Sequence, residues 1–300
     1  MSEPQERGES AVETRKLVSV IIPSYNRAHI ISQTIPSYMQ EGVGEIIVID
    51  DCSTDNTQEV LQKLKKEIPC LVIKKNKKNR RQTYSKNRGI RLAQYPYIYF
   101  GDDDSFITEG TIPTLLGYIQ KYPDALISAR PLFLKTGWQM KDLKRYIRST
   151  EKHPAEKGYR FLDWETMSVD WDVFYTDLTK TDVTHACFLI STENASKLSF
   201  DSAYQAANAF REETDFAMQA REMGLSCYFA PHAHQINYPR MVSDKKTTKR
   251  SGLAFRWGHF KNTKYFFDKH YDFMKLNNMV HSSKGRILLR YLYSEVSQLW

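Results

Sequence analysis

Strand patterns alternate with helix patterns through the first hundred residues, and this alternation limits the fold more than any other feature of the sequence. Four short runs rich in β-branched and aromatic side chains are typical of buried strands: Leu17–Ile22, Glu45–Ile49, Leu71–Lys74 and Tyr97–Phe100. Three stretches between them predict helices: Ala28–Gln40, Asp55–Glu67 and Thr83–Ala93. Pro36 is expected to kink or end the first helix. Strands that alternate with helices predict an α/β fold with a parallel sheet covered on both faces.

The rest of the sequence continues this pattern with less regularity. Further elements are predicted as helices at Ile112–Lys121 and Asp215–Met223, and as strands at Ala125–Ala129, Val183–Ser191 and Leu225–Ala230. Gly224 is expected to end the second of these helices. Residues 130–181 show few clear periods. We therefore predict a flexible tail at 1–16, one α/β domain at 17–240 and a basic, largely helical extension at 241–300.

The last stretch, Lys284–Trp300, predicts an amphipathic helix. Four apolar side chains fall on one helical face: Leu288, Leu292, Val296 and Leu299. Arg286 and Arg290 lie near the start of the helix, and basic residues beside an apolar face can bind an anionic membrane. The alternative is packing on the same domain or on a second subunit. Because the chain stops on the apolar Trp300, we expect the natural protein to continue beyond it.

Composition narrows the class of protein. Hydrophobic residues make up 41% and aromatic residues 13% of the chain, which favours a folded globular protein over a disordered one. No run approaches 18 apolar residues and no apolar signal region begins the chain, so we expect a cytoplasmic location. Four scattered cysteines are expected to be reduced thiols: Cys52, Cys70, Cys187 and Cys227.

Positive charge is concentrated in two segments. The chain has 43 basic and 35 acidic residues, a net charge of +8. Lys74–Arg91 contains nine Lys or Arg and no acid, and Met241–Trp300 contains twelve against four acids. Such segments attract phosphate groups on nucleotides, nucleic acids or lipids, although a solvated lysine-rich surface explains part of the first.

Polar and acidic residues follow three of the predicted strands. The residues are Pro23, Tyr25 and Arg27 after the first strand, Asp50 and Asp51 after the second, and Asp102, Asp103 and Asp104 after the fourth. Ligands of such sheets bind beyond the carboxyl ends of the strands. Crowded carboxylates are tolerable if Mg²⁺ or Mn²⁺ sits among them, and the alternative is a solvated acidic turn. Neither GxGxxG nor GxxxxGK[ST] occurs, so a nucleotide must be held in another way.

Several of these motifs, in order, resemble family 2 glycosyltransferases, which have the GT-A fold. The resemblance is carried by Val18–Arg27, Glu45–Asp55, Lys86–Ile90 and Tyr97–Asp104, and it returns at Arg211–His234. It implies a Rossmann-like, mostly parallel sheet with a nucleotide-binding half at 17–116 and an acceptor half at 117–240. Gly101 departs from the pattern, since many relatives carry an apolar residue there, and we expect it to alter packing more than metal binding.

The resemblance implies roles in binding a nucleotide-sugar. Tyr25 would stack on the base and Asp51 would accept a hydrogen bond from it, while Arg81 or Arg27 would reach the base or the diphosphate. Asp102 would bind the ribose or a metal-bound water. Pro23 belongs to the same binding loop, and Asp103 lies between the other two aspartates as a spacer. The alternatives are loop packing for the tyrosine and solvated surface charge for the arginines.

The resemblance also implies a metal site and a catalytic base. Asp104 would bind Mn²⁺ or Mg²⁺, with His234 as an additional ligand or, alternatively, a structural histidine. The stretch Arg211–Met218 resembles the region that carries the base of inverting members, and this places the base at Glu213. Two further acids are fallback candidates: Glu212 and Asp215. The alternative for each acid is a charge favoured at a helix N-terminus.

Together these expectations describe an inverting, metal-dependent glycosyltransferase. It would move a sugar from a nucleotide-diphosphate donor, most plausibly a UDP-sugar, to a hydroxyl of a saccharide or lipid-linked acceptor. A nucleotidyltransferase is a competing interpretation, but it usually needs a glycine-rich loop after the first strand. A non-enzymatic module that binds nucleic acid or membrane is another, but it leaves the aspartates at the strand ends unexplained. We predict no nucleic-acid partner, and we leave open a homo-oligomer and peripheral contact with the inner face of a membrane.

Overall fold

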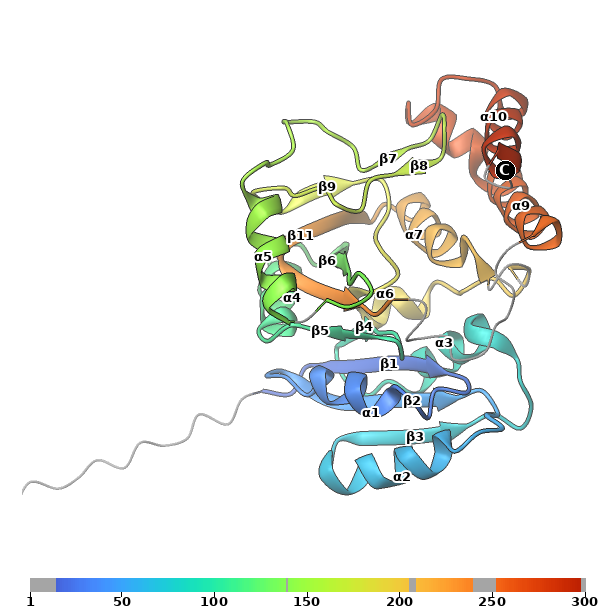
Figure 1. Cartoon of the computed structure of the whole chain (residues 1–300). Coiled ribbons are helices and arrows are strands. Elements are labelled where there is room, and N and C mark those ends of the chain that lie inside the picture. Colours follow the sequence, from blue (N-terminus) through green and yellow to red (C-terminus); the bar gives the residue numbers. More distant parts are fainter. Residues whose placement is uncertain (1–14, 139, 205–208, 240–251, 298–300) are drawn as a thin grey trace, which may run out of the picture.

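The computed structural model describes residues 15–138, 140–204, 209–239 and 252–297, and its centre is a nine-stranded sheet with helices on both faces (Figure 1). The strands are β1 Val18–Ser24, β2 Val43–Asp50, β3 Leu71–Lys75, β4 Tyr97–Phe100, β5 Ser105–Ile107, β6 Ala125–Phe133, β9 Thr179–Thr181, β10 Phe188–Ser191 and β11 Ser226–Asn237. A separate hairpin pairs β7 Leu162–Asp163 with β8 Ser168–Val169.

The helices cover the sheet and extend the chain beyond it. They are α1 Ile31–Thr34, the 3₁₀ helix η1 Ile35–Tyr38, α2 Thr57–Glu67, α3 Arg81–Leu92, α4 Thr111–Ile119, α5 Met140–Glu151, α6 Thr192–Ser196, α7 Glu212–Glu222, α9 Leu253–Leu276 and α10 Lys284–Ser297. In the parts of the chain described here, no helix is long and apolar enough to cross a membrane.

Strand order brings three strand ends to one edge of the sheet. The order is β3-β2-β1-β4-β10-β6-β11-β5, with β9 paired to β11. The first four strands are parallel, so β1, β2 and β4 end side by side at Ser24, Asp50 and Phe100. Beyond β4 the sheet is mixed, because β10 runs antiparallel to both of its neighbours and β5 and β9 run antiparallel to β11. The predicted parallel arrangement therefore holds for the first half of the sheet.

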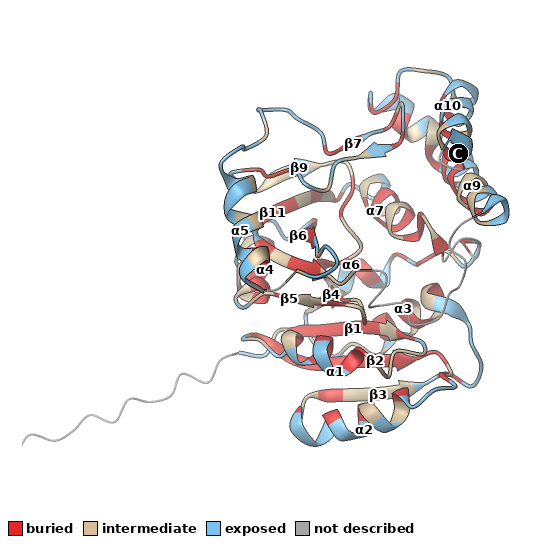
Figure 2. Ribbon diagram, in the orientation of Figure 1, coloured by how far each residue is buried: buried red, intermediate tan, exposed pale blue. Residues whose placement is uncertain are grey.

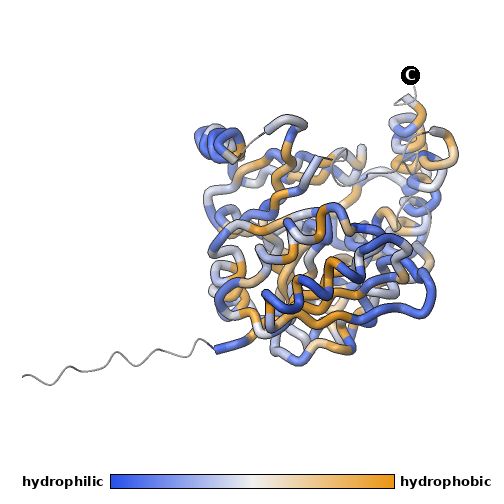
Figure 3. Tube along the Cα trace, turned by 60° about the horizontal axis from the view of Figure 1, so that its bottom comes forward, coloured by the Kyte–Doolittle hydropathy of each residue, from blue (hydrophilic) through white to orange (hydrophobic). Residues whose placement is uncertain are grey.

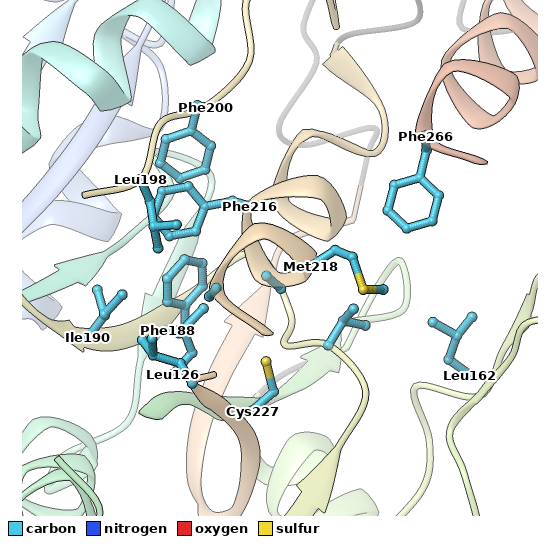
Figure 4. Close-up of a cluster of buried hydrophobic side chains, with 14 of the residues drawn as sticks. Leu126, Leu162, Phe188, Ile190, Leu198, Phe200, Phe216, Met218, Cys227 and Phe266 are labelled. Carbon is cyan, nitrogen blue, oxygen red and sulfur yellow. The ribbon is translucent and has the colours of Figure 1, made fainter. Parts of the chain in front are cut away.

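Alternating side chains build a core on each face of the sheet. Ile21 and Phe100 point to the face covered by α3, α7 and α9, whereas Val20 and Tyr99 point to the face covered by α1, α2 and α4. Figure 2 shows the strands buried between these two layers. In Figure 4, Phe216 of α7 lies near Phe188 of β10. Burial of this kind contributes about 1.5–3 kcal/mol for each large apolar side chain.

Most predicted elements of the first half are confirmed, and the first helix is shorter than predicted. It consists of α1 and the single 3₁₀ turn η1, because Pro36 lies at the start of that turn. The strand predicted at Val183–Ser191 contains only β10 as regular structure. Gly224 ends α7 as predicted, with a left-handed φ of 90°. Gly89 lets α3 pack closely on β1, since a Cβ there would lie 2.3 Å from Ile21 Cγ2.

The region predicted to be irregular contains a full helix, α5. Among the described side chains of α5, the inward-facing apolar ones are Leu143, Tyr146 and Ile147, and the basic residues around them hide the helical period. The C-terminal extension packs into the main core through α9, whose Phe266, Phe267 and Met274 are fully buried. The predicted tail at 1–16 lies almost wholly outside the described residues.

The buried face of α10 differs from the predicted one by one position. Its buried side chains are Ile287, Tyr291 and Glu295, whereas Val296 is exposed and Leu299 lies outside the described residues. A polar residue takes the third inward position because Glu295 has partners there. Tyr291 donates a hydrogen bond of 2.7 Å to its carboxylate, and Arg256 of α9 forms an ion pair with it at 3.1 Å. The helix thus packs on its own domain, which is the alternative considered for this segment.

Candidate active site

A cleft of about 1080 Å³ opens at the carboxyl ends of β1, β2 and β4. Nine of the residues predicted to form the site line it: Pro23, Tyr25, Arg27, Asp51, Arg81, Asp102, Asp103, Asp104 and Glu213. Three predicted residues do not line it: Glu212, Asp215 and His234. Tyr25 is 42% exposed, so one face of its ring is available to a flat ligand. The structure therefore brings the nucleotide-binding candidates and the candidate base into one cavity.

The loop that carries the three aspartates is braced by a buried tyrosine. The hydroxyl of Tyr38 donates to the carbonyl of Asp102 at 2.9 Å and accepts from its backbone N–H at 3.2 Å. Space for the ring exists because residue 101 is glycine. A Cβ on Gly101 would lie 2.9 Å from Cε1 of the tyrosine. The departure at Gly101 thus alters packing, as expected, and it does so by admitting the residue that fixes the loop.

The three aspartates differ in their surroundings. Asp103 is buried and forms an ion pair with Arg27 Nε at 3.1 Å, while Nη2 of the same arginine lies 3.6 Å from Asp104. Asp102 accepts a hydrogen bond from the thiol of Cys187 at 3.4 Å. Burial, and after it repulsion from Asp104 against the opposing attraction of Lys86, raises the pKa of Asp102 to about 6. Asp103 therefore anchors the arginine, and the outer two aspartates form a crowded pair.

This pair suits a divalent cation in its chemistry. Asp102 and Asp104 offer carboxylate oxygens to the cleft, and their mutual repulsion would be relieved by a hard cation of the Mg²⁺ or Mn²⁺ type. Among the described residues, however, no three or more His, Cys, Asp or Glu side chains gather as a complete metal-binding group. The candidate ligands for a cation in the described part of the chain are therefore the carboxylates of Asp102 and Asp104.

His234 is not brought to Asp104 by the sheet. In the pairing of β11 with β5, the carbonyl of His234 accepts a hydrogen bond from Thr108 N at 3.1 Å. Thr108 is four residues beyond Asp104, a separation of roughly 13 Å along a strand. Burial, aided by the charge of Arg130, lowers the pKa of His234 to about 4. This separation argues against a metal site shared with Asp104, while Nε2 of His234 is buried without a hydrogen-bond partner among the described residues, so its role stays a prediction.

Asp51 holds the start of α3. Its Oδ1 accepts a hydrogen bond from Asn76 Nδ2 at 2.7 Å, and its two oxygens accept from the backbone N–H groups of Arg80 at 2.9 Å and Arg81 at 2.6 Å. A carboxylate is favoured here because the first N–H groups of a helix carry partial positive charge. Asp51 thus joins the end of β2 to α3 and places Arg81 at the cleft. Contact of Asp51 with a nucleotide base stays a prediction.

A buried lysine holds the candidate base. Lys86 of α3 is fully buried, and its Nζ donates to Glu213 Oε1 at 2.7 Å and to Glu212 Oε1 at 2.8 Å. Burial raises the pKa of Glu212 well above its usual value. Burial would also raise the pKa of Glu213, but the Lys86 ammonium holds it below the usual value. Glu213 is therefore an ionised carboxylate on the wall of the cleft, and Glu212 is a buried partner behind it.

Asp215 is directed away from the cleft. It is fully buried and accepts hydrogen bonds from Tyr204 at 3.0 Å and Lys269 Nζ at 3.0 Å, and it contacts Nε2 of His270 at 2.8 Å. The last two partners belong to α9, so this aspartate ties α7 to the C-terminal extension. Of the three acids at the start of α7, only Glu213 lines the cleft.

Three residues with clear roles in the site were given none by the sequence. Lys86 stands in a motif that carried the family resemblance, so its position was marked but its partners were not. Cys187 was expected to be a reduced thiol, with no contact to the aspartates predicted for it. Tyr38 gave no signal, because nothing in a single aromatic residue indicates a contact with a loop 64 residues later.

Comparison with known families and proteins agrees with this geometry. The family described as "Glycosyl transferase family 2" matches residues 19–189, more than half of the chain. The minor teichoic acid biosynthesis protein GgaB of Bacillus subtilis is 27% identical over 124 residues, 40% of this chain and 14% of that protein. The poly(ribitol-phosphate) β-N-acetylglucosaminyltransferase TarP of Staphylococcus aureus is 32% identical over 109 residues, 34% of this chain and 33% of that protein.

A third relative acts on a lipid-linked saccharide by its name. It is the GalNAc(5)-diNAcBac-PP-undecaprenol β-1,3-glucosyltransferase of Campylobacter jejuni, 31% identical over 118 residues, 37% of this chain and 38% of that protein. The matched part of this chain thus spans less than two fifths of the length of each of these three relatives.

Solved structures show the same fold at low sequence identity. TarS 1-349 of S. aureus in complex with UDP-GlcNAc has a TM-score of 0.60 at 16% identity, covering 94% of this chain and 73% of that chain. GalNAc-T7 with UDP, GalNAc and Mn²⁺ has a TM-score of 0.63 at 14% identity, covering 96% of this chain and 58% of that chain. The mannosyltransferase PcManGT of Pyrobaculum calidifontis with GDP-Man and Mn²⁺ has a TM-score of 0.58 at 17% identity, covering 96% and 73%. The fold is therefore GT-A.

Proposed function

Because this chain belongs to glycosyltransferase family 2, we propose that it transfers a sugar from a UDP-sugar to a hydroxyl group of a saccharide or lipid-linked acceptor, with inversion at the sugar carbon. One observation carries the proposal: a single cleft contains the nucleotide-binding candidates, the aspartate pair and an ionised carboxylate on a separate helix. Support for a nucleotide donor comes from the similar structures that hold UDP-GlcNAc, UDP or GDP-Man.

The nucleotide would bind against residues 17–116. Tyr25 offers an exposed ring face for the base, and Arg27 and Arg81 bring positive charge to the same cleft. Arg27 is held in place by Asp103, so its guanidinium is oriented before the ligand arrives. These residues bind and orient the donor and leave its sugar directed toward the acceptor half at 117–240.

Asp102 and Asp104 would hold a divalent cation, and Mn²⁺ in two of the similar structures supports this assignment. Bound there, Mn²⁺ or Mg²⁺ would supply Lewis-acid stabilisation of the diphosphate leaving group. The protein's part is to fix the two carboxylates, through Tyr38 on the backbone of the loop and Cys187 on the Asp102 side chain. We leave His234 out of this site because of its distance along the strand.

Glu213 would act as the general base. An inverting transfer needs a group that removes the proton of the attacking hydroxyl, on the side of the sugar opposite the leaving diphosphate. Lys86 keeps Glu213 ionised and fixes one of its carboxylate oxygens, so the carboxylate would be held in place on the cleft wall to accept that proton. Lys86 is therefore a positioning residue. Its second hydrogen bond goes to the buried carboxyl of Glu212.

A nucleotide panel in a thermal-unfolding assay tests the proposal. UDP, GDP, dTDP and CDP are each added with and without Mn²⁺. We expect the largest stabilisation from UDP with Mn²⁺, about 2.7 kcal/mol at a ligand concentration of roughly one hundred times Kd. The absence of a shift with every nucleotide would contradict donor binding. Inversion is then checked by NMR, as an anomeric configuration in the product opposite to that of the donor.

A further inference from the structure

Helix α5 presents one strongly basic face to solvent. Four exposed basic residues of the helix recur at helical spacing, and Lys152 follows directly after its end: Lys141, Lys144, Arg145, Arg148 and Lys152. Their side chains line an open groove of about 520 Å³. Figure 3 shows this helix as a hydrophilic coil at the upper left edge of the molecule. Asp142 lies 3.9 Å from Arg145, but a pair with an arginine that is 81% exposed leaves most of the positive charge unbalanced.

The opposite face of α5 is used for packing on the protein itself. Leu143 is buried, and Tyr146 and Ile147 pack in the same small cluster, which includes Leu132 of β6 and Ile236 of β11. The hydroxyl of Tyr146 also donates a hydrogen bond to Asp172. The orientation of the helix is thereby fixed with its basic residues outward.

The packed face of α5 connects the helix to the aspartate loop. The cluster under α5 includes Phe106, which pairs with Ile236 and lies two residues beyond Asp104, a separation of roughly 7 Å along the strand. Asp104 itself is also bonded to the segment that follows β11, since the backbone N–H of Tyr238 donates to the carbonyl of Asp104 at 3.3 Å. The packed face of α5 therefore contacts the strand that follows the aspartate loop, in the half of the chain assigned to the acceptor, and the groove lies on the outer side of the same helix.

We propose that the basic face of α5 binds the anionic backbone of the acceptor, a polymer with repeated phosphodiester or carboxylate groups. This inference rests on the proposed function and names the chemical class of its acceptor. From Lys141 to Arg148 the face extends about 10 Å, at 1.5 Å a residue, and Lys152 continues it beyond the helix end, so it meets several charges of a linear chain at once. The growing end of that chain would then reach the cleft beside Asp104.

An anionic membrane is the competing occupant, and the packing of α5 argues against it. Helices that bind a bilayer surface insert an apolar face between the lipids. The apolar side chains of α5 face its own sheet, as Leu143 shows by being buried there. Because the described side chains of α5 expose basic groups and no apolar face to solvent, its surface is suited to binding a soluble polyanion.

The test compares two triple variants of the full chain. The first carries Lys141→Gln, Lys144→Gln and Arg148→Gln. The control carries Lys63→Gln, Lys66→Gln and Arg91→Gln, which removes three exposed charges from α2 and α3. Glutamine retains helix propensity, so both variants should fold. Fluorescence anisotropy measures binding of labelled poly(glycerol phosphate), of a neutral dextran oligosaccharide and of vesicles of phosphatidylglycerol and phosphatidylcholine, at several salt concentrations.

We expect the wild type and the control to bind poly(glycerol phosphate) and not the neutral saccharide. The α5 variant should bind it about tenfold more weakly at low salt, with a slope of log affinity against log salt reduced by roughly two, at ~0.7 for each charge removed. Equal affinities of the two variants would overturn the inference, and so would loss of vesicle binding alone. UDP with Mn²⁺ should stabilise all three proteins equally, and failure of that shift in the wild type would instead count against the proposed function.

Discussion

On the nucleotide side of the cleft, the site residues follow directly from strands β1, β2 and β4, whereas the candidate base stands on the first turn of α7, far along the chain. The aspartate loop on the first side is held by close packing and neutral hydrogen bonds, as with Tyr38 against Gly101, and an ion pair joins Arg27 to Asp103. The second is held by charge, through the buried Lys86 between two glutamates. Changes of shape should therefore affect donor binding, and changes of charge should affect transfer.

The largest effect is expected from removing a carboxylate on the nucleotide side. Asp104→Asn should lower the rate of transfer by roughly a thousandfold, ~4 kcal/mol of transition-state stabilisation, because the proposed cation loses a charged ligand. Initial rates with and without added Mn²⁺ measure the effect. Asp124→Asn, an exposed aspartate outside the cleft, is the matched control. Full activity of the Asp104 variant would remove the metal assignment.

The side of the cleft that carries Glu213 can be tested by a substitution of Lys86. Lys86→Met should lower the free energy of unfolding by about 3–5 kcal/mol, because the carboxyls of the buried Glu212 and the part-buried Glu213 lose the ammonium between them, although Glu212 keeps its hydrogen bond from Gln82. Adding Glu212→Gln should recover much of the stability without recovering the rate, since Glu213 is still unpositioned. Denaturant unfolding and steady-state kinetics separate the two outcomes. A Lys86→Met enzyme with normal kcat would show that the lysine has no part in holding the base.

The packing of Tyr38 against the aspartate loop can be tested by a substitution of Gly101. Gly101→Ala should displace the Tyr38 ring, cost about 1–3 kcal/mol of stability and weaken UDP binding. Gly117→Ala in α4 is the control, because a Cβ there meets nothing within 4 Å and alanine favours a helix. Thermal unfolding and calorimetric titration of UDP measure both effects. Unchanged UDP affinity in a destabilised Gly101 variant would separate the tyrosine contact from donor binding.

The smallest effect concerns pH. Because Lys86 holds the pKa of Glu213 below its ordinary value, the carboxylate stays ionised as the pH falls through the usual glutamate range, near 4.5. The rate of transfer should therefore decline only below that range, as Glu213 becomes protonated. The pH profile of kcat measures this. With Mn²⁺ at saturating concentration, so that protonation of Asp102 near pH 6 does not set the profile, a decline centred above pH 5 would contradict a base with a lowered pKa, once folding at that pH has been confirmed by circular dichroism.

The sequence predicted well which residues gather at the carboxyl ends of β1, β2 and β4, because its information there is local. Residues such as Tyr25, Asp51 and Asp104 follow buried strands, and parallel strands place their ends together. It predicted less where a role depends on contacts between distant segments. Lys86 meets Glu213 across 127 positions of the chain, and His234 was assigned to the metal without knowledge of the β5–β11 pairing.

The same limit explains the helices that were misjudged. The inward face of α10 was placed one position away, because the apolar period alone favoured Leu288 and Leu292. The structure instead buries Glu295, which a sequence pattern cannot predict without Arg256 in place. Helix α5 was missed because its few apolar residues are separated by basic ones, yet those basic residues are the ones that suggest a ligand.

The central claim is that Glu213 is the base of a nucleotide-sugar transferase, and the variant Glu213→Gln tests it most directly. Titration with UDP and Mn²⁺ should give the wild-type affinity, because the amide leaves the nucleotide side untouched. Transfer from the UDP-sugar in single-turnover conditions should fall by roughly 10²–10⁴-fold, the usual contribution of general-base catalysis. Transfer at the wild-type rate, with UDP binding intact, would contradict the account.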